Sequence, residues 1–287
     1  MLISQSKQQY IRKIIKTRDL DLKEPVIRLY PLPCFHVGAA QSDVIFIRQH
    51  VKRIQEDPNA IWIYLGDGGE CVTKLSKGSI YDQLYSPQEQ LEILEELLAP
   101  IKDKGWAGIR GNHGYRIYKE TGISFDSALC VSLGIPYMDA QTWAHLRVNR
   151  SDYNLYFHHG VDSGITSQAK LNSAEKFTKY IDVDALFTAH SHVGLELPPA
   201  ALLRVSNVKM KVETKLRHQY ICGSGYDSRT GYAAEKGYPP LLPQFIVVEF
   251  SGRTIHGYPI INQKYTRYIS EGQHEVTGVY NYRSGAR

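Results

Sequence analysis

The sequence lacks the paired cysteines and long apolar runs that mark secreted and membrane proteins. Its four cysteines, Cys34, Cys71, Cys130 and Cys222, form no C-x-x-C pair, and scattered thiols of this kind are typical of a reducing compartment. No stretch approaches the roughly 18 apolar residues of a transmembrane helix, and the N-terminal segment has no apolar signal-peptide core. We therefore expect a cytoplasmic protein that is neither exported nor inserted in a membrane.

Motifs of several common enzyme classes are absent as well. The chain has no P-loop and no G-x-G-x-x-G after a predicted strand, which argues against nucleotide-driven work and a dinucleotide cofactor. It has no G-x-S-x-G nucleophile elbow, so a serine hydrolase is disfavoured. It also has no internal repeat with a period of about 20–50 residues, which excludes a solenoid.

The composition is that of an ordinary globular protein with a mild basic excess. Of the 287 residues, 43% are hydrophobic and 22% are charged. Lys and Arg number 34 against 29 Asp and Glu, a formal charge of +5 that favours an anionic partner without identifying a nucleic-acid binder. We expect one domain over residues 1–262. The polar, patternless residues 263–287 indicate a C-terminal extension, either a loose tail or an oligomer contact.

Short apolar runs alternate with helical patterns along the chain. One helix is expected after the N-cap residue Asp43, and another after the capping box that begins at Ser86. Strands alternating with helices indicate an α/β sandwich. A closing group of antiparallel strands is expected after about residue 218. The six earlier predicted strands are 26–32, 60–65, 106–109, 144–148, 153–157 and 185–188.

Side chains that bind metals well follow five of these strands directly. An open α/β sheet builds its site at the carboxyl ends of its strands. A lone histidine is more often structural, but repetition of the same placement favours a metal site. A mixture of imidazole and oxygen ligands suits Zn, Mn or Fe better than Ca or Mg. The residues, in chain order, are His36, Asp67, Asn112, His113, His159, His190 and His192.

The segments that contain these residues resemble a known motif series. They are PCFHVG (33–38), LGDGGE (65–70), GNHGYR (111–116), HHG (158–160) and AHSH (189–192). Their order is similar to D-x-H, G-D, G-N-H followed by an acid, H-G and G-H-x-H of the calcineurin-like metallophosphoesterase superfamily. The loop 231–240 also resembles phage-type members. The resemblance implies an α/β sandwich of two mixed sheets flanked by helices, and phosphoester hydrolysis.

The resemblance also implies a role for each matching residue. Two divalent ions (Mn, Zn or Fe) about 3.5–4 Å apart would be bridged by an aspartate. The bridge would be Asp67, with His36 and His192 at the first metal and Asn112, His159 and His190 at the second. His159 is preferred over its neighbour His158 because the motif histidine directly precedes glycine. His113 would act as the general acid, and Arg116 is a candidate for neutralising the phosphate.

Two positions depart from the family pattern. Cys34 stands where the family has an aspartate, and it is either a thiolate ligand for Zn or Fe or a buried, inert cysteine beside a degenerate first site. Gly114 stands where the family has the acid that orients the catalytic histidine. Glu70 either compensates for that loss, binds substrate or, as we favour, is a solvated loop carboxylate.

A basic stretch and many tyrosines leave the substrate open. The stretch either follows a phosphate backbone beside the site or is a solvated strand pair. Tyrosines near the motifs either stack on bases or cap the edge of the core, and we favour the core edge. The basic residues are Arg204, Lys209, Lys211, Lys215, Arg217 and His218. The tyrosines are Tyr81, Tyr85, Tyr115, Tyr118, Tyr226, Tyr232 and Tyr238.

These patterns favour a metal-dependent phosphoesterase with His113 as general acid. We expect phosphodiesters, either nucleic acid or cyclic-nucleotide-like molecules, ahead of phosphoprotein. A small-molecule phosphomonoesterase is a further possibility. The alternative from another class is a catalytically weak or inactive module that binds nucleic acid or protein, and the departures at Cys34 and Gly114 are its motivation. The sequence does not reveal the oligomeric state.

Overall fold

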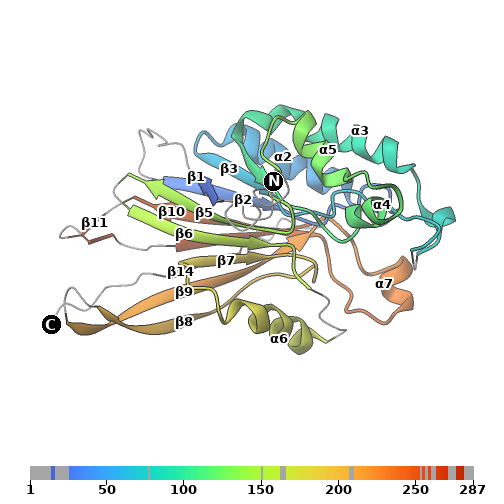
Figure 1. Ribbon diagram of the computed structural model, residues 1–287. Helices are drawn as coiled ribbons and strands as arrows, with labels where there is room; N and C mark the ends of the chain where they lie inside the picture. The colour runs from blue at the N-terminus through green and yellow to red at the C-terminus, as the bar shows by residue number, and fades with distance from the viewer. Residues whose placement is uncertain are drawn as a thin grey trace, which may run out of the picture.

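The structure is a computed structural model, and two mixed β-sheets form its centre (Figure 1). It describes residues 14–16, 26–76, 78–149, 151–161, 166–206, 210–252, 254–255, 258–259, 263–270 and 276–280. Helices flank the sheets, so the predicted α/β sandwich of two mixed sheets is confirmed. Among the described residues, no helix has both the length and the apolar character needed to cross a bilayer.

The first sheet contains the three parallel strands that begin the motif series. β2 (Val26–Leu32) pairs with β3 (Ala60–Tyr64), which pairs with β4 (Gly105–Gly108). On the other side of β2, the antiparallel strand β10 (Gln244–Ser251) is followed by β13 (Gln263–Ile269) and β14 (Val276–Tyr280). The carboxyl ends of β2, β3 and β4 therefore lie at the same edge of the sheet.

The second sheet continues the first through a short pairing of β9 with β10 at Ser224 and Gly223. Its order is β1 (Ile14–Lys16), β5 (Gln141–Val148), β6 (Ser151–His158), β7 (Ala185–Thr188) and β9 (Lys211–Ser224), with β8 (Gly194–Ser206) along β9. β6 and β7 are parallel, so their carboxyl ends also meet. Outside both sheets, β11 (Thr254–Ile255) pairs with β12 (Tyr258–Pro259).

The main core lies between the two sheets, because alternate residues of each strand face the partner sheet. Leu29 and Ile63 of the first sheet belong to one buried cluster with Leu155 and Phe187 of the second. The intervening residues of β2 and β3, such as Trp62, belong to a second cluster with the helices. Both faces of the first sheet are thus buried, which fixes the strand ends that carry the predicted site.

Helices cover the outer face of the first sheet. They are α2 (Val44–Glu56), α3 (Pro87–Leu98) and α5 (Phe125–Ser132), with short 3-10 helices at Ile80–Asp82 and Ala99–Lys104. Both predicted caps are confirmed, since Asp43 accepts from the Phe46 N–H and Ser86 forms a full capping box. Figure 1 shows α4 (Gly114–Thr121) and α7 (Gly231–Glu235) towards one end of the strands, and α6 (Ser167–Thr178) on the opposite side of the sheets from α2 and α3.

The segment after residue 262 shows more structure than its sequence pattern indicated. β13 pairs with β10 along its whole length, from Gln263 opposite Phe250 to Ile269 opposite Gln244. Its sequence QKYTRYI lacks the apolar alternation of a strand with one buried face, so periodicity gave no signal. The strand forms because its backbone pairs with the buried strand β10.

His50 on α2 is a buried histidine without a hydrogen-bond partner at either ring nitrogen. Its ring packs 4.7 Å from that of Phe245 and 5.5 Å from that of Tyr30, measured between centroids. Burial, followed by the nearby Arg53, lowers the pKa of His50 to about 3. The folded state therefore contains neutral His50, whereas the unfolded chain binds a proton below a pKa of about 6.5.

We expect His50→Leu to reduce the acid sensitivity of the fold. A depressed histidine pKa contributes stability that is complete above the unfolded value and is lost as pH falls. Between pH 8 and pH 5, this loss amounts to about 2 kcal/mol for His50. Urea unfolding at the two pH values should show a smaller difference for His50→Leu than for the natural chain. An equal difference would show that His50 is not the source of the acid sensitivity.

Candidate metal centre

The strand ends bring the predicted ligands into two adjoining groups. Cys34 and His36 follow β2, Asp67 follows β3, and His159, His190 and His192 follow β6 and β7. The potential ligand atoms of Cys34, His36 and His192 all lie within 4.8 Å of one another, as do those of Cys34, Asp67 and His159. Asp67 also forms such a group with His36 and His113. The carboxylate of Asp67 therefore connects the two groups.

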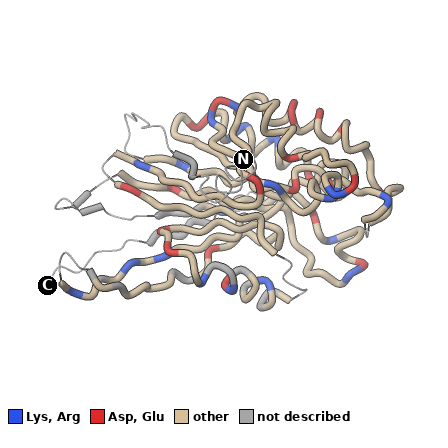
Figure 2. The backbone as a smooth tube through the Cα atoms, in the orientation of Figure 1, with Lys and Arg blue, Asp and Glu red and all other residues tan. Residues whose placement is uncertain are grey.

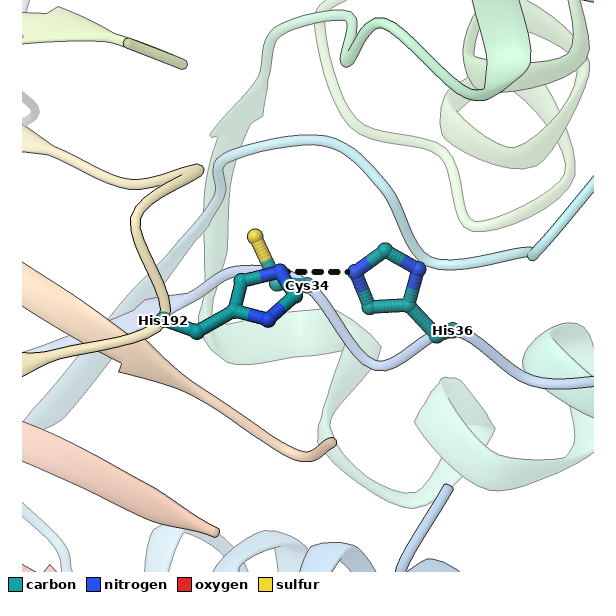
Figure 3. A group of neighbouring side chains, drawn as sticks. All are labelled: Cys34, His36 and His192. Atoms are coloured by element: carbon teal, nitrogen blue, oxygen red, sulfur yellow. Dashed lines mark hydrogen bonds between the residues drawn. The ribbon is translucent and has the colours of Figure 1, made fainter. Parts of the chain in front are cut away.

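The first group contains two imidazoles that meet through their Nε2 atoms. Nε2 of His36 lies 3.0 Å from Nε2 of His192, and Figure 3 shows the sulfur of Cys34 beside the rings. Nδ1 of His36 lies 2.8 Å from Oε2 of Glu70, so Nδ1 carries the proton and Nε2 presents a lone pair. Two nitrogens that both bind a metal at about 2.0–2.1 Å come to lie about 3 Å apart, which matches this spacing.

The second group places two oxygen atoms beside one imidazole nitrogen. Nε2 of His159 lies 2.9 Å from Oδ2 of Asp67 and 3.0 Å from Oδ1 of Asn112. Nδ1 of the same ring lies 2.6 Å from the carbonyl oxygen of Leu65, to which it donates. The ring of His190 lies 5.3 Å from that of His159, measured between centroids. A nitrogen this close to two oxygens requires a proton or a metal cation between them.

In the second group, Asp67 and His159 each stabilise the charged form of the other. Burial by itself would raise the pKa of Asp67, but the neighbouring His159 and His113 hold that pKa well below its ordinary value. Burial would lower the pKa of His159, but the Asp67 carboxylate raises it. The aspartate is thus an anion in the interior, where an isolated charge is costly. A divalent ion can take the place of the His159 proton.

Asp67 provides a direct test of whether a metal fits. Its side chain is buried, and no hydrogen bond of acceptable geometry reaches Oδ2, although His159 Nε2 is close. Its other oxygen, Oδ1, accepts from the backbone N–H of His113 at 2.7 Å. A carboxylate oriented by one oxygen and left without a donor at the other is arranged as metal-ligating carboxylates are. The residues present therefore fit a divalent metal ion.

The backbone at the predicted ligands is strained. Positive φ angles are rare outside glycine and cost about 1–3 kcal/mol each, and they cluster at functional sites. Among the described residues, nine other than glycine have positive φ, and five of these are predicted ligands. Packing between the sheets has to hold these five residues in their strained conformations. The five are Cys34 (52°), His36 (52°), Asp67 (56°), His190 (66°) and His192 (59°).

Glu70 is not the solvated loop carboxylate that we favoured from the sequence. Its Oε2 lies 2.8 Å from Nδ1 of His36 and 3.4 Å from Nδ1 of His113, and Oε1 lies 4.0 Å from Arg116. Burial would raise the pKa of Glu70, but His113, His36 and Arg116 lower it. Glu70 was misassigned because its partners are distant in sequence. It orients both a predicted ligand and the predicted catalytic histidine.

His113 contacts the site through both ring nitrogens. Nδ1 lies 2.8 Å from the carbonyl oxygen of Glu70, and Nε2 lies 3.0 Å from Nη2 of Arg116. Because a guanidinium only donates, Nε2 accepts and Nδ1 carries the proton. Burial lowers the pKa of His113 to about 4, against the opposing effect of Asp67 and Glu70. His113 is therefore neutral here, and its role as a general acid remains a prediction.

The space at Gly114 is occupied by a carboxyl group that the sequence analysis missed. A Cβ built on Gly114 would lie 2.3 Å from Oδ2 of Asp126. Asp126 is buried, and it accepts from the Tyr64 hydroxyl at 2.7 Å and from the Gly111 N–H at 3.3 Å. The Tyr64 hydroxyl in turn accepts from the Gly68 N–H at 2.8 Å. Asp126 and Tyr64 thus hold together the loops that carry Asp67 and Asn112.

A cleft of about 1140 Å³ opens over the two groups. His36, Asn112, His113, His190 and His192 line it, whereas Cys34, Asp67 and His159 are buried beneath. Arg116 and Lys170 bring positive charge to the same cleft. Lys170 on α6 donates to the carbonyl oxygen of Ser191 at 2.9 Å, beside two predicted ligands. Sequence reasoning missed Lys170 because nothing in its own segment distinguishes it.

The basic stretch does not line this cleft, which argues against the alternative in which it follows a phosphate backbone beside the site. Its described residues belong to the antiparallel pair β8 and β9, as the strand-pair alternative predicted. At about 3.3 Å per residue, Lys211 lies roughly 35 Å along β9 from Cys222, which is at the site end. Figure 2 shows this charge towards the far end of the pair. Lys215 contacts Asp182 and Asp184, so its charge is partly neutralised.

Comparison with known proteins gives similarity of fold at low sequence identity. No family model matches the sequence, and no curated protein does either. A single mutant of Vps29 from Entamoeba histolytica is 11% identical with a TM-score of 0.44, covering 90% of this chain and 100% of that one. A double mutant of the same protein is also 11% identical, with a TM-score of 0.43, and the match covers 90% of this chain and 99% of that one. A protein from Thermotoga maritima is 12% identical, with a TM-score of 0.30, and the match covers 89% of this chain and 99% of that one. Similarity of this degree carries no argument about activity.

Cys34 is expected to hold one of two metals. Its sulfur belongs to both ligand groups, and it is fully buried, so burial raises the pKa of the thiol well above its ordinary value. Metal coordination deprotonates a thiol despite such burial. We expect elemental analysis of protein purified without chelator to show two divalent ions per chain, falling to one in Cys34→Ala.

The matched control is Cys130→Ala, which removes an equally buried thiol that lies in the other core cluster and belongs to none of the ligand groups. It should keep the metal content of the natural chain. A Cys34→Ala protein with unchanged metal content would identify Cys34 as an inert core residue. Fewer than two ions in the natural protein would indicate a degenerate first site.

Proposed function

We propose that the protein is a metal-dependent phosphoesterase that hydrolyses phosphodiester bonds. The observation that supports it best is the position of Asp67, whose buried carboxylate connects two groups of imidazole, thiol and amide ligands. Such a carboxylate is what a pair of neighbouring divalent ions requires. Arg116 and Lys170 line the cleft above these groups and can contact an anionic phosphate there.

In this proposal, Cys34, His36 and His192 would hold the first ion, Asn112, His159 and His190 would hold the second, and Asp67 would be available to both. Bound ions supply activation of water and neutralisation of the phosphoryl oxygens. The chain's own residues orient the ligands. Glu70 fixes the tautomer of His36, and the Leu65 carbonyl fixes that of His159.

Arg116 and His113 act together on the phosphate. In the structure Arg116 donates to Nε2 of His113, which keeps that nitrogen free of a proton. A phosphate oxygen is a stronger acceptor than a neutral imidazole, so a bound substrate draws the guanidinium away from the ring. Nε2 of His113 can then take a proton and deliver it to the leaving oxygen. Arg116 meanwhile binds the phosphate, and Lys170 adds a second charge from α6.

The proposal is tested by hydrolysis of bis-p-nitrophenyl phosphate. Protein loaded with Mn or Zn is expected to release p-nitrophenol, and the release should stop after treatment with chelator and resume after metal is added back. The dependence follows because the proposed hydrolysis uses water activated by the bound ions. Metal-loaded protein that releases no p-nitrophenol would favour the alternative function, a binding module with the same fold.

A further inference from the structure

The mouth of the cleft is aromatic and apolar, in contrast to its polar floor. On one wall, the loop after Glu70 exposes Leu75 (83%) and Tyr81 (91%). On the other, Tyr232 (43% exposed) and Tyr238 (39% exposed) project from α7 and the loop behind it. From the sequence we favoured the interpretation that these tyrosines cap the edge of the core. Their exposure at the cleft contradicts it. Apolar surface at the mouth of a polar cleft marks a binding site.

The wall that carries Tyr232 and Tyr238 is a fixed structure. The hydroxyl of Ser228 donates to the Pro239 carbonyl at 2.9 Å and accepts from the Leu241 N–H at 2.7 Å, which closes the loop at its base. The rings of Tyr232 and Tyr238 meet edge to face, with centroids 6.4 Å apart and planes at 81°. Two rings held in this way form a preorganised platform, and preorganisation reduces the entropic cost of binding.

The platform is close to the ligand groups. The ring of Tyr226 lies 5.3 Å from that of His36 and 5.6 Å from that of His192, measured between centroids. Tyr226 also packs in one buried cluster with Ala233, the residue next to Tyr232. Tyr226 thus links the metal-binding floor to the helix that carries Tyr232. A phosphate joined to a sugar and a base has one end suited to the floor and the other suited to the platform.

The charges of the cleft suit one phosphate rather than a chain of phosphates. Its cationic lining side chains are Arg116, Lys119 and Lys170, and its acidic ones are Glu70, Asp82, Glu120 and Glu235. A groove that follows a polynucleotide backbone has an excess of positive charge over several phosphates. Here that excess is missing, and the basic stretch of β9 lies at the other end of the strand. The cleft therefore recognises one phosphate and a flat aromatic group.

We propose that the substrate is an ester of a nucleoside monophosphate, with the base stacked at the Tyr232 and Tyr238 platform and the phosphate on the metal-binding floor. The proposal rests on the phosphoesterase function above and adds a base-binding subsite to it. Tyr81 faces the same cleft from the opposite wall. Lys236, whose Nζ lies 5.5 Å from the centre of the Tyr232 ring, adds a cation to the platform. Stacking accepts any base, so the subsite selects nucleotides as a class.

Binding is the first test, because it does not depend on turnover. Metal-loaded protein is titrated calorimetrically with adenosine 5′-monophosphate, ribose 5-phosphate and inorganic phosphate. Adenosine 5′-monophosphate should bind at least about tenfold more tightly than ribose 5-phosphate, as expected for one stacked base. Equal affinity of the three ligands would overturn the base subsite. A single-stranded 20-mer that binds far more tightly per molecule than the mononucleotide would overturn the restriction to one phosphate.

Variants then locate the subsite. Tyr232→Ala and Tyr238→Ala should each weaken adenosine 5′-monophosphate about tenfold and leave ribose 5-phosphate unchanged. Tyr180→Ala is the matched control, since Tyr180 is 90% exposed and lies outside the residues that line the cleft. Loss of affinity for both ligands in the platform variants would contradict stacking.

Kinetics separates this inference from the proposed function. The ratio of kcat/KM for p-nitrophenyl thymidine 5′-monophosphate to that for bis-p-nitrophenyl phosphate should fall in Tyr232→Ala. An unchanged ratio, with both substrates hydrolysed, would overturn the base subsite and leave the phosphoesterase intact. Base-dependent binding without hydrolysis of either substrate would sink the phosphoesterase and retain the subsite.

Discussion

Replacement of His113 by alanine is expected to slow phosphodiester cleavage by about 10²–10⁴-fold while the metal content stays unchanged. The ring of His113 is held between the Glu70 carbonyl and Arg116, and it lines the cleft. Its loss therefore removes proton transfer and frees Arg116. The measurement is the initial rate of p-nitrophenol release, with elemental analysis of the same preparation.

The control for this variant is His145→Ala, because His145 lies on β5, contacts Asp152 and does not line the cleft. Its rate should equal that of the natural chain. His113 also shares a possible ligand group with His36 and Asp67. A variant that loses metal together with activity would therefore show that His113 is a ligand and would contradict its role as general acid.

The positions of the predicted ligands could be inferred from the sequence because they follow from one topological rule. Carboxyl ends of parallel neighbouring strands meet at one edge, so a residue directly after each strand joins the same site. His36, Asp67 and His159 each follow a strand whose apolar pattern was clear in the sequence. The structure brings the ligand atoms of Asp67 within 4.8 Å of those of both histidines. Periodicity and strand order were sufficient for this part of the site.

The supporting residues could not be inferred because their contacts depend on packing. Asp126 approaches Gly114 from α5, and Lys170 reaches the Ser191 carbonyl from α6. Neither residue lies in a motif or has a distinctive neighbour in the sequence. Glu70 was noticed, but its neighbours in space, His36 and Arg116, come from the loop after β2 and from α4. Contacts between loops are set by the packing of helices on the sheet, which a local pattern does not specify.

The strained backbone is a second feature that the sequence pattern could not predict. His190 and His192 have positive φ angles of 66° and 59°, which local propensity disfavours for histidine. A propensity argument would place a different residue at each position. The packed sheets supply the free energy that holds both histidines in this conformation. Disagreement between local preference and observed conformation thus coincides with five of the predicted ligands.

Restoring an acid at position 114 is expected to damage the protein, although the family pattern places an acid there. In Gly114→Asp, the new Cβ would lie 2.3 Å from Oδ2 of Asp126, and a second carboxyl group would enter a buried site. Burial already raises the pKa of Asp126 to about 7, so another carboxylate beside it is costly. We expect the free energy of unfolding to fall by at least about 1–3 kcal/mol, the range of overpacked cores. Urea denaturation measures this loss.

Gly114→Ala separates the steric effect from the charge. In an unobstructed helix, alanine in place of glycine stabilises by about 1 kcal/mol, but here the added Cβ meets the carboxyl group of Asp126. Since overpacking costs about 1–3 kcal/mol, we expect Gly114→Ala to be neutral or destabilising, and Gly114→Asp to be worse. Combining Gly114→Asp with Asp126→Ala should recover part of the loss, because the two side chains compete for one space. A Gly114→Ala protein that is more stable than the natural chain would show that Asp126 does not occupy the space beside residue 114.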